Sequence, residues 1–301
     1  MRLDPGTVAV VTGAGSGIGR AVSLALAARG CHLALVDRSE EGLEETRELL
    51  QAAGRRPVTL HVLDVADREA MAQLPEVVSE YHRTAHLLVN NAGVSLAGPL
   101  DAVSLEDMEW IVGVNFWGAV YACRAFLPSL RQAPAAHIVN VLSDFALLGF
   151  PTRTAYCATK FALRGFTEGL RAELHHVGIG VTAVYPGPAA TNIVRAGRNW
   201  DPARALLEDE FLQARGLPLS TIAERTVRGV ERNAARVLIG RETYLIDGMT
   251  RLCPVLTGRL LARFQDWIGF LGDSLRIPPG SAEEPERDTA EGPPGSKEGR
   301  G

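Results

Sequence analysis

The sequence predicts an α/β protein in which helices cover both faces of a parallel sheet of about seven strands. From residue 7 onward, short apolar runs rich in β-branched side chains alternate with longer stretches at helical spacing. The short runs are apolar throughout, which is typical of strands that are buried on both faces. Because parallel strands are joined by right-handed crossovers, we expect a single doubly wound domain over residues 1–248.

Each element follows from this alternation. Residues 17–29 place Ile18, Val22 and Leu26 on one helical face, and Asp67 is suited to cap the helix that follows it. The helices are predicted at residues 17–29, 40–53, 67–81, 104–130, 156–176 and 221–233. The strands are predicted at residues 7–12, 33–37, 58–63, 86–89, 137–142, 179–185 and 237–239.

Composition excludes several classes of protein. The 301 residues include 31 Lys and Arg against 35 Asp and Glu, a net charge of −4, so we expect no nucleic-acid partner. The cysteines are scattered and form no C-x-x-C pair, which argues against a zinc site or a disulfide scaffold and fits a reducing compartment. Asp4 comes too early for a secretory signal peptide, so we expect a cytoplasmic protein.

The C-terminal part of the chain differs from the rest. Residues 249–276 form an extension that is apolar and basic at mixed helical spacing within 249–272. Pro254 and Gly258 interrupt the pattern, which favours a helix packed on the domain or on a subunit neighbour. A helix on a membrane surface is the alternative. Residues 277–301 are rich in Pro, Gly and acids, and we expect them to be disordered.

A glycine cluster, T-G-A-G-S-G-I-G over residues 12–19, stands between the first strand and the first helix. Glycine lets the backbone approach a pyrophosphate closely, and the helix N-terminus offers free N–H groups and a positive dipole end. Asp37 ends the second strand, where a carboxylate can accept both hydroxyls of an adenosine ribose. The combination predicts a Rossmann-type dinucleotide site.

Tyr156 and Lys160 lie four residues apart on a predicted helix and therefore share one face. A free phenol has a pKa of about 10, and a nearby ammonium lowers it by roughly 1–3. Lys160 can also hold ribose hydroxyls, and Ser143 can donate a hydrogen bond to a substrate oxygen beside the tyrosine. The pattern indicates proton transfer by Tyr156.

These motifs, in this order and spacing, resemble the short-chain dehydrogenase/reductase family over roughly residues 5–250. The matching motifs are T-G-x-x-x-G-I-G at residues 12–19, N-N-A-G at 90–93, Y-x-x-x-K at 156–160 and P-G at 186–187. The resemblance implies a catalytic tetrad of Asn115, Ser143, Tyr156 and Lys160, and a homodimer or homotetramer. The dinucleotide contacts expected from motifs and resemblance together are Gly13, Ser16, Gly17, Ile18, Gly19, Asp37, Arg38, Asp64, Val65, Asn91, Ala92, Gly93, Tyr156, Lys160, Pro186, Gly187 and Thr191.

The cofactor expected is NAD, with NADP as the alternative. Asp37 would repel the 2′-phosphate of NADP, and residue 16 is Ser rather than a basic residue. Arg38 points the other way, because a guanidinium beside the ribose could accept that phosphate.

The predicted substrate pocket is apolar. We expect substrate contacts from Ser143, Phe145, Leu147, Phe150 and Tyr156, and a partly helical lid over residues 193–219. Residues 143–150 contain no Arg or Lys to hold a carboxylate, so we expect an apolar secondary alcohol or ketone, of the steroid or retinoid kind. Three alternatives remain open: an NADP-linked carbonyl reductase, a dinucleotide-binding sensor without chemistry, and an enzyme held at a membrane through residues 249–272.

Overall fold

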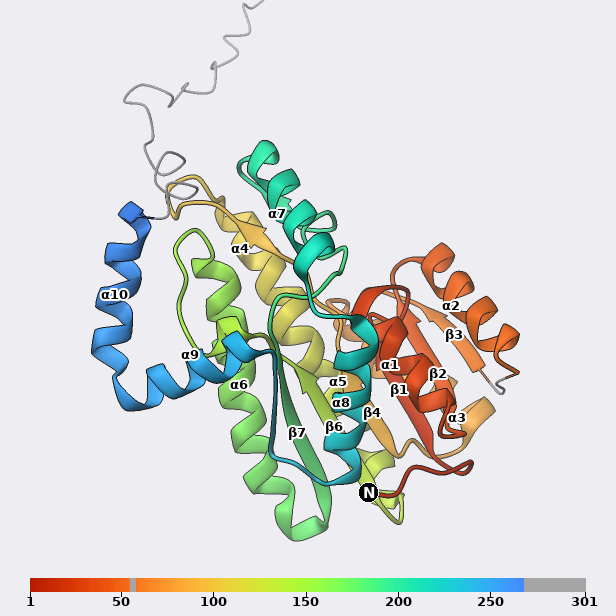
Figure 1. Cartoon of the computed structure of the whole chain (residues 1–301). Coiled ribbons are helices and arrows are strands. Elements are labelled where there is room, and N and C mark those ends of the chain that lie inside the picture. Colours follow the sequence, from red (N-terminus) through yellow and green to blue (C-terminus); the bar gives the residue numbers. More distant parts are fainter. Residues whose placement is uncertain (55–57, 268–301) are drawn as a thin grey trace, which may run out of the picture. The chain divides into compact units, whose positions relative to one another are not determined.

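Helices on both faces of one parallel sheet make up the protein, as the sequence predicts (Figure 1). The structure is a computed structural model that describes residues 1–54 and 58–267. The seven strands lie in the order β3-β2-β1-β4-β6-β7-β9, and every pair is parallel. They are β1 (Val8–Thr12), β2 (His32–Asp37), β3 (Val58–Val62), β4 (Leu87–Asn90), β6 (Ala136–Val141), β7 (Ile179–Pro186) and β9 (Arg236–Ile239).

The helices form two layers, each with its own core. Successive residues of β1 point to opposite faces: Ala9 and Val11 pack toward one layer, and Val10 packs toward the other. The first layer holds α1 (Gly17–Ala27), α2 (Glu40–Ala52) and α8 (Leu219–Glu231). The second holds α3 (Arg68–His82), α4 (Leu105–Val112), α5 (Gly118–Gln132) and α6 (Thr154–Leu174). Burial of each strand on both faces explains the unbroken apolar runs.

The long helix predicted at residues 104–130 is present, and its middle turn is π-helical rather than α-helical. A π-helical segment, η1 (Gly113–Trp117), joins α4 to α5 without a break in the helical path. The continuous run Leu105–Gln132 is long and apolar enough for a membrane span by length and composition. Half of its most apolar part is buried within the protein, and its buried side chains pack in the second core. The run is therefore a core helix of the fold.

Several elements were not predicted individually. A short pair, β5 (Leu96–Ala97) and β8 (Arg198–Asn199), lies apart from the main sheet. The predicted lid contains α7 (Pro202–Arg215), with Asp201 as its N-cap. The last two helices of the described residues are α9 (Arg241–Leu252) and α10 (Pro254–Trp267). The expected domain boundary at residue 248 lies within α9. Residues 268–276 of the expected extension and the expected tail lie outside the described residues.

Strand order creates a crevice at the carboxyl ends of β1 and β4. The chain runs from β1 outward to β3, and then returns to place β4 on the other side of β1. The loops after β1 and β4 therefore part in opposite directions and leave a space between them. Figure 1 shows α7 over this edge of the sheet.

Candidate active site

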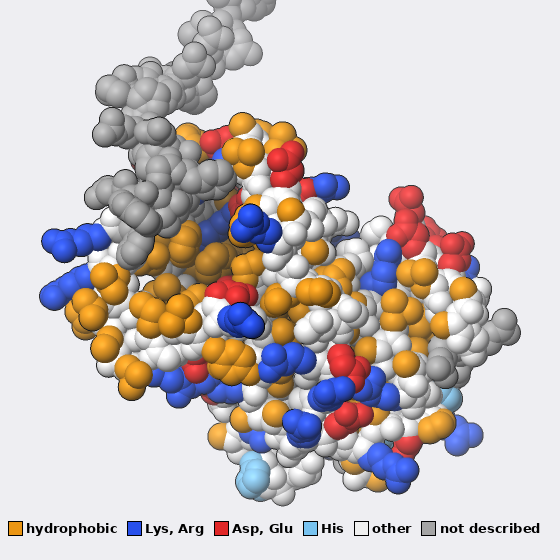
Figure 2. Space-filling model, in the orientation of Figure 1, with side chains coloured by type: hydrophobic (Ala, Val, Ile, Leu, Met, Phe, Trp, Pro, Cys, Tyr) orange, Lys and Arg blue, Asp and Glu red, His pale blue; other side chains and the backbone are white. Residues whose placement is uncertain are grey.

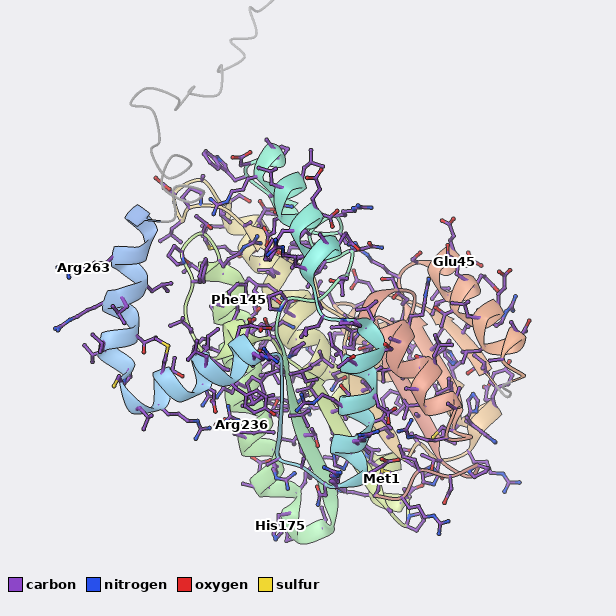
Figure 3. The ribbon with its side chains drawn as sticks, viewed as in Figure 1. Met1, Glu45, Phe145, His175, Arg236 and Arg263 are labelled. Atoms are coloured by element: carbon purple, nitrogen blue, oxygen red, sulfur yellow. The ribbon has the colours of Figure 1, made fainter. Side chains whose placement is uncertain are left out.

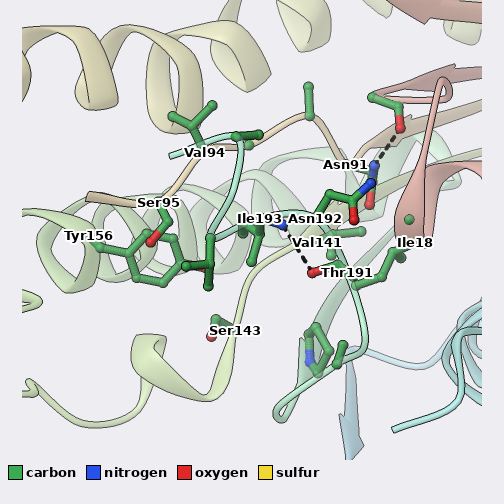
Figure 4. A pocket seen from close by; sticks show the side chains of 18 of the residues that line it. Ile18, Asn91, Val94, Ser95, Val141, Ser143, Tyr156, Thr191, Asn192 and Ile193 are labelled. Carbon is green, nitrogen blue, oxygen red and sulfur yellow. Dashed lines mark hydrogen bonds between the residues drawn. The ribbon is translucent and has the colours of Figure 1, made fainter. Parts of the chain in front are cut away.

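A cavity of about 470 Å³ occupies the carboxyl-end crevice. Figure 4 shows Ile18, Asn91 and Thr191 toward one end of it, and Tyr156, Ser95 and Ser143 toward the other. The first end is built mainly from backbone and glycine, and the second from side chains of the loops after β4 and β6 and of α6. The two ends can therefore perform different tasks.

The glycine loop has the backbone shape that its sequence requires. Gly13 and Gly17 have φ of 66° and 52°, in the left-handed region that side-chain-bearing residues rarely adopt. A Cβ on Gly19 would lie 2.0 Å from the carbonyl oxygen of Gly13. Ser16, the N-cap of α1, makes no side-chain capping bond. The first N–H groups of α1 have no partner within their helix and border the cavity, which suits a pyrophosphate.

Asp37 faces the glycine loop from the end of β2. Its carboxylate accepts hydrogen bonds from the N–H of Gly15 at 2.9 Å and from the N–H of Ser39 at 3.0 Å. A carboxylate fixed in this way retains free lone pairs for ribose hydroxyls. Arg38 borders the same part of the cavity.

Asn91 fastens the loop after β4 to the glycine loop. Its side-chain amide donates to the carbonyl oxygens of Thr12 at 3.1 Å and Gly13 at 3.2 Å. In return, the Thr12 hydroxyl accepts from the N–H groups of Asn91 at 3.0 Å and Ala92 at 3.1 Å. These bonds hold the two loops at a fixed separation and shape the dinucleotide end of the cavity.

Tyr156 and Lys160 project from α6 to the cavity, and both side chains are buried. The ammonium nitrogen of Lys160 lies 5.7 Å from the centroid of the Tyr156 ring and donates to the carbonyl oxygen of Val141 at 3.2 Å. Burial lowers the pKa of Lys160 to about 8. Burial also raises the pKa of Tyr156, and the neighbouring Ser143 hydroxyl opposes this shift by a smaller amount.

The pKa of Tyr156 is shifted in the opposite direction to the one that the sequence predicts. We expected the ammonium to lower the pKa of the phenol, but burial raises it. Phenolate and ammonium both lose their hydration in this site, and that loss favours the neutral form of each group.

Asn115 lies in the π-helical segment and is 1% exposed. Its Oδ1 accepts from the N–H of Val94 at 2.8 Å, and its Nδ2 donates to the carbonyl oxygen of Val94 at 3.0 Å and to the hydroxyl of Thr159 at 3.2 Å. The side chain is thus committed to holding the β4 loop against α6. A Cβ on Gly93 would lie 3.3 Å from Asn115 and 3.4 Å from Lys160, so glycine keeps these groups close.

Ser143 follows β6 and caps a short 3-10 turn, η2 (Asp144–Ala146). Its hydroxyl donates to the carboxyl Oδ1 of Asp144 at 2.8 Å and accepts from the N–H of Phe145 at 3.2 Å. The Phe145 ring meets the Tyr156 ring edge to face, with centroids 5.9 Å apart. Figure 3 shows Phe145 in the middle of the molecule, between α6 and the loops above the sheet.

The substrate end of the cavity is largely apolar but contains an ion pair between a buried arginine and a partly exposed glutamate. Arg153, three residues before Tyr156, is 8% exposed and donates to the hydroxyl of Ser95 at 2.8 Å. Its guanidinium also pairs with the carboxylate of Glu208 on α7. Apolar side chains form the rest of this end: Val94, Phe145, Ile193, Val194, Phe211 and Leu212.

A family model for short chain dehydrogenases matches residues 7–202. The chain belongs to the short-chain dehydrogenase/reductase family. It is 40% identical over 262 residues to the oxidoreductase SadH of Mycobacterium tuberculosis, a match that covers 85% of this chain and 94% of that one. The present chain is also similar in structure to a short-chain dehydrogenase/reductase from Burkholderia phymatum in complex with NAD, with 30% identity and a TM-score of 0.80. That match covers 85% of the present chain and 96% of the Burkholderia one.

A further relative carries a different cofactor. An alcohol dehydrogenase from Thermococcus sibiricus complexed with 5-hydroxy-NADP has 29% identity and a TM-score of 0.66, with coverage of 78% of this chain and 94% of that one. Both forms of the dinucleotide therefore occur among structural neighbours of this dehydrogenase family member.

The cavity brings together most of the residues that the motifs and the resemblance singled out. Gly19 and Asn115 are the exceptions among the cofactor and tetrad residues, because both support the site from behind its wall. The predicted residues that line the cavity are Gly13, Ser16, Gly17, Ile18, Asp37, Arg38, Asp64, Val65, Asn91, Ala92, Gly93, Ser143, Phe145, Tyr156, Lys160, Pro186, Gly187 and Thr191.

The predicted substrate wall is only partly at the surface of the cavity. Leu147 is buried in a separate cluster with Tyr185. Phe150 lies behind Phe145, with the two rings tilted against each other and their centroids 5.4 Å apart. Arg153 and Glu208 were not anticipated. Arg153 lies three residues beyond the 143–150 stretch that contains no Arg or Lys. Its ion-pair partner is 55 positions away along the chain, so no local pattern reveals the pairing.

Proposed function

We propose that this oxidoreductase interconverts an apolar secondary alcohol and its ketone with NAD as the hydride carrier. The observation that carries the proposal is that Ser143, Tyr156 and Lys160 border the same cavity as the glycine loop and Asp37. A hydrogen-bonding serine and a phenol beside an ammonium are suited to move a hydroxyl proton, and the glycine loop is suited to hold the hydride carrier next to them.

The residues present fit a dinucleotide. The N–H groups at the start of α1 suit the pyrophosphate, Asp37 suits the adenosine ribose, and Lys160 suits the other ribose. When bound, NAD supplies the hydride acceptor and a positively charged nicotinamide ring. Asp37 supports NAD over NADP, because its carboxylate would meet the 2′-phosphate of NADP without a compensating cation other than Arg38.

In the oxidation direction, Tyr156 accepts the proton of the substrate hydroxyl, and Ser143 holds the substrate oxygen beside it. Lys160 stabilises the phenolate and holds the ribose, and Asn115 keeps the loop that carries Gly93 and Val94 in place against α6. The family resemblance adds a water behind Lys160 through which the proton leaves.

The cavity supports an apolar substrate in spite of Arg153. Glu208 neutralises this guanidinium, and Ser95 occupies another of its donors. A substrate carboxylate would have to displace Glu208, whereas a hydrocarbon ring or chain would rest against Phe145, Ile193 and Phe211.

The proposal is tested with a panel of hydroxysteroids, retinols and long-chain secondary alcohols, with NADH absorbance as the readout. We expect turnover with members of this panel and at least a tenfold higher kcat/KM with NAD than with NADP. Turnover of small charged hydroxy acids alone would overturn the substrate class, and a tenfold preference for NADP would overturn the cofactor.

Contact with a membrane surface is a second proposal, supported by the face that α9 and α10 present. Large apolar side chains here are well exposed, with Leu252 83%, Val255 67% and Leu256 53% accessible. Figure 2 shows hydrophobic side chains gathered where Figure 1 places these helices. Arg251 and Arg259 lie among them and would meet anionic headgroups.

Assembly into a homodimer or homotetramer also remains a proposal. It rests on the family resemblance and on exposed aromatic side chains at Trp117 and Phe161, beside α5 and on α6, which are 45% and 40% accessible. A cytoplasmic location, peripheral to a membrane, is consistent with both surfaces.

A further inference from the structure

Asp144 is an acidic side chain at the active site for which the proposed mechanism has no use. It borders the cavity directly after Ser143 and is only 7% exposed. Its Oδ1 accepts from the Ser143 hydroxyl at 2.8 Å and from the N–H of Phe145 at 2.9 Å. Ser143 by itself already caps this turn through Phe145, so local structure does not require a buried carboxylate here.

The bond between Ser143 and Asp144 limits what Ser143 can offer the substrate. A serine hydroxyl has one proton, and here that proton is donated to the carboxylate. Ser143 then presents only lone pairs to the reacting oxygen. A ketone oxygen has no proton of its own and needs a donor, so the carboxylate form leaves it without one from Ser143.

A neutral Asp144 would reverse this arrangement. The protonated carboxyl becomes a donor and can give its proton to the Ser143 oxygen, which frees the serine proton to point at the substrate. Burial and the nearby Glu242 raise the pKa of Asp144 to about 6, so both forms are accessible near neutral pH. The titratable or charged groups on the elements packed against this turn include Arg153, Tyr156, Cys157, Lys160 and Arg164 of α6 and its N-cap, Glu242 of α9 and Tyr185 of β7.

We propose that Asp144 is a positioning residue that sets the hydrogen-bonding direction of Ser143. The carboxylate form draws the Ser143 proton away from the substrate oxygen, and the protonated form makes Ser143 a donor and favours the ketone. This inference rests on the proposed alcohol–ketone reaction for its consequence, but the coupling between the two side chains does not depend on any substrate.

The coupling is measured first without substrate, by carbon NMR of the full-length protein labelled at the aspartate carboxyl carbons. We expect one resonance with a titration midpoint near pH 6 that disappears in Asp144→Asn. In Ser143→Ala the midpoint should rise by at least half a pH unit, because the carboxylate loses a donor. A midpoint that Ser143→Ala leaves unchanged would overturn the proposal.

The consequence is measured with 2-decanone and 2-decanol as probes. Burial raises the pKa of Tyr156, and both Asp144 variants keep this tyrosine, so a pH dependence that came from Tyr156 would persist in them. We expect kcat/KM for the ketone to rise about tenfold from pH 8 to pH 5 in the wild-type enzyme. In Asp144→Ala, kcat/KM for the ketone should stay near the upper wild-type value at every pH, since Ser143 is then free to donate. In Asp144→Asn, kcat/KM should also be independent of pH, but at a lower value.

Glu242→Gln is the matched control. It removes the Glu242 carboxylate, which raises the pKa of Asp144. The rise in kcat/KM for the ketone should therefore occur at lower pH in this variant, but it should not disappear. A rise that persists in both Asp144 variants overturns the proposal. If neither probe is turned over by the wild-type enzyme, the proposed substrate class fails instead, and the Ser143→Ala midpoint decides the inference.

Discussion

At the scale of single residues, charge and burial oppose each other in this site. Tyr156 and Lys160 are both buried. Burial raises the pKa of Tyr156 and lowers the pKa of Lys160, so it favours the neutral form of each group. Asp144 behaves in the same way, with a pKa raised to about 6. Each group therefore depends on a neighbour for its charged form, which makes the site responsive to small changes in its immediate surroundings.

Tyr156→Phe removes the proposed proton carrier and almost nothing else, because the ring still packs edge to face against Phe145. We expect kcat to fall by at least about a hundredfold, the contribution typical of general acid–base catalysis. NADH binding, followed by its fluorescence, should be unchanged. Full activity in this variant would instead favour a dinucleotide-binding protein whose chemistry does not use the tyrosine.

Asp144 also makes stability depend on pH. Its folded pKa of about 6 lies above the unfolded value near 3.8, so the folded state binds the proton more tightly. Stability from this group is complete below about pH 4 and is lost as the pH rises through 6. At pH 7.5 we expect Asp144→Asn to have a higher unfolding temperature than wild type, with a free energy of unfolding larger by up to about 3 kcal/mol. At pH 4 this difference should disappear. Thermal unfolding at both pH values measures the difference, and an equal advantage at both would contradict it.

At the scale of elements, helices define the substrate end of the cavity. The π-helical turn at Asn115 joins α4 to α5, and the Asn115 side chain holds the β4 loop. On the opposite side, α7 is joined to the N-terminus of α6 through Glu208 and Arg153, and to the chain before it through Asp209 and Arg195. These ion pairs fix α7 beside the N-terminus of α6.

Glu208→Ala tests the ion pair between α7 and α6. The change leaves the Arg153 guanidinium in the cavity without its carboxylate, and an unpaired buried charge disfavours apolar ligands. We expect KM for an apolar alcohol to rise at least fivefold, and KM for a carboxylated analogue to fall. Glu210→Ala, an exposed glutamate on the same helix, is the control and should change neither value.

At the scale of the whole molecule, the described surface is uneven. Exposed leucine and valine side chains are concentrated on α9 and the first half of α10, next to arginines. Thr257 fastens the two helices together by donating to the carbonyl oxygens of Met249 at 3.1 Å and Cys253 at 2.8 Å. An apolar face in a fixed shape, bordered by positive charge, fits a lipid surface.

Flotation with vesicles tests that surface. We expect the full-length protein to float with vesicles that contain phosphatidylglycerol and to float less with neutral phosphatidylcholine vesicles. The double variant Leu252→Glu and Leu256→Glu should lose most of this binding, while Leu105→Glu, at a 77% exposed leucine elsewhere, should not. Undiminished flotation of the double variant would contradict the proposal, and a smaller assembly in gel filtration would assign the face to contacts between subunits.

The sequence by itself determined the doubly wound sheet, the glycine loop and the Tyr156–Lys160 pair, because each depends on residues close together along the chain. Periodicity reports burial on one or two faces, and four-residue spacing places side chains on one face of a helix. Tertiary structure decided what lies between distant segments: the ion pair of Arg153 with Glu208, the tie from Asn115 to Val94, and the burial that raises rather than lowers the pKa of Tyr156. These properties depend on which groups exclude water from one another, and hydration is lost only when the chain has packed.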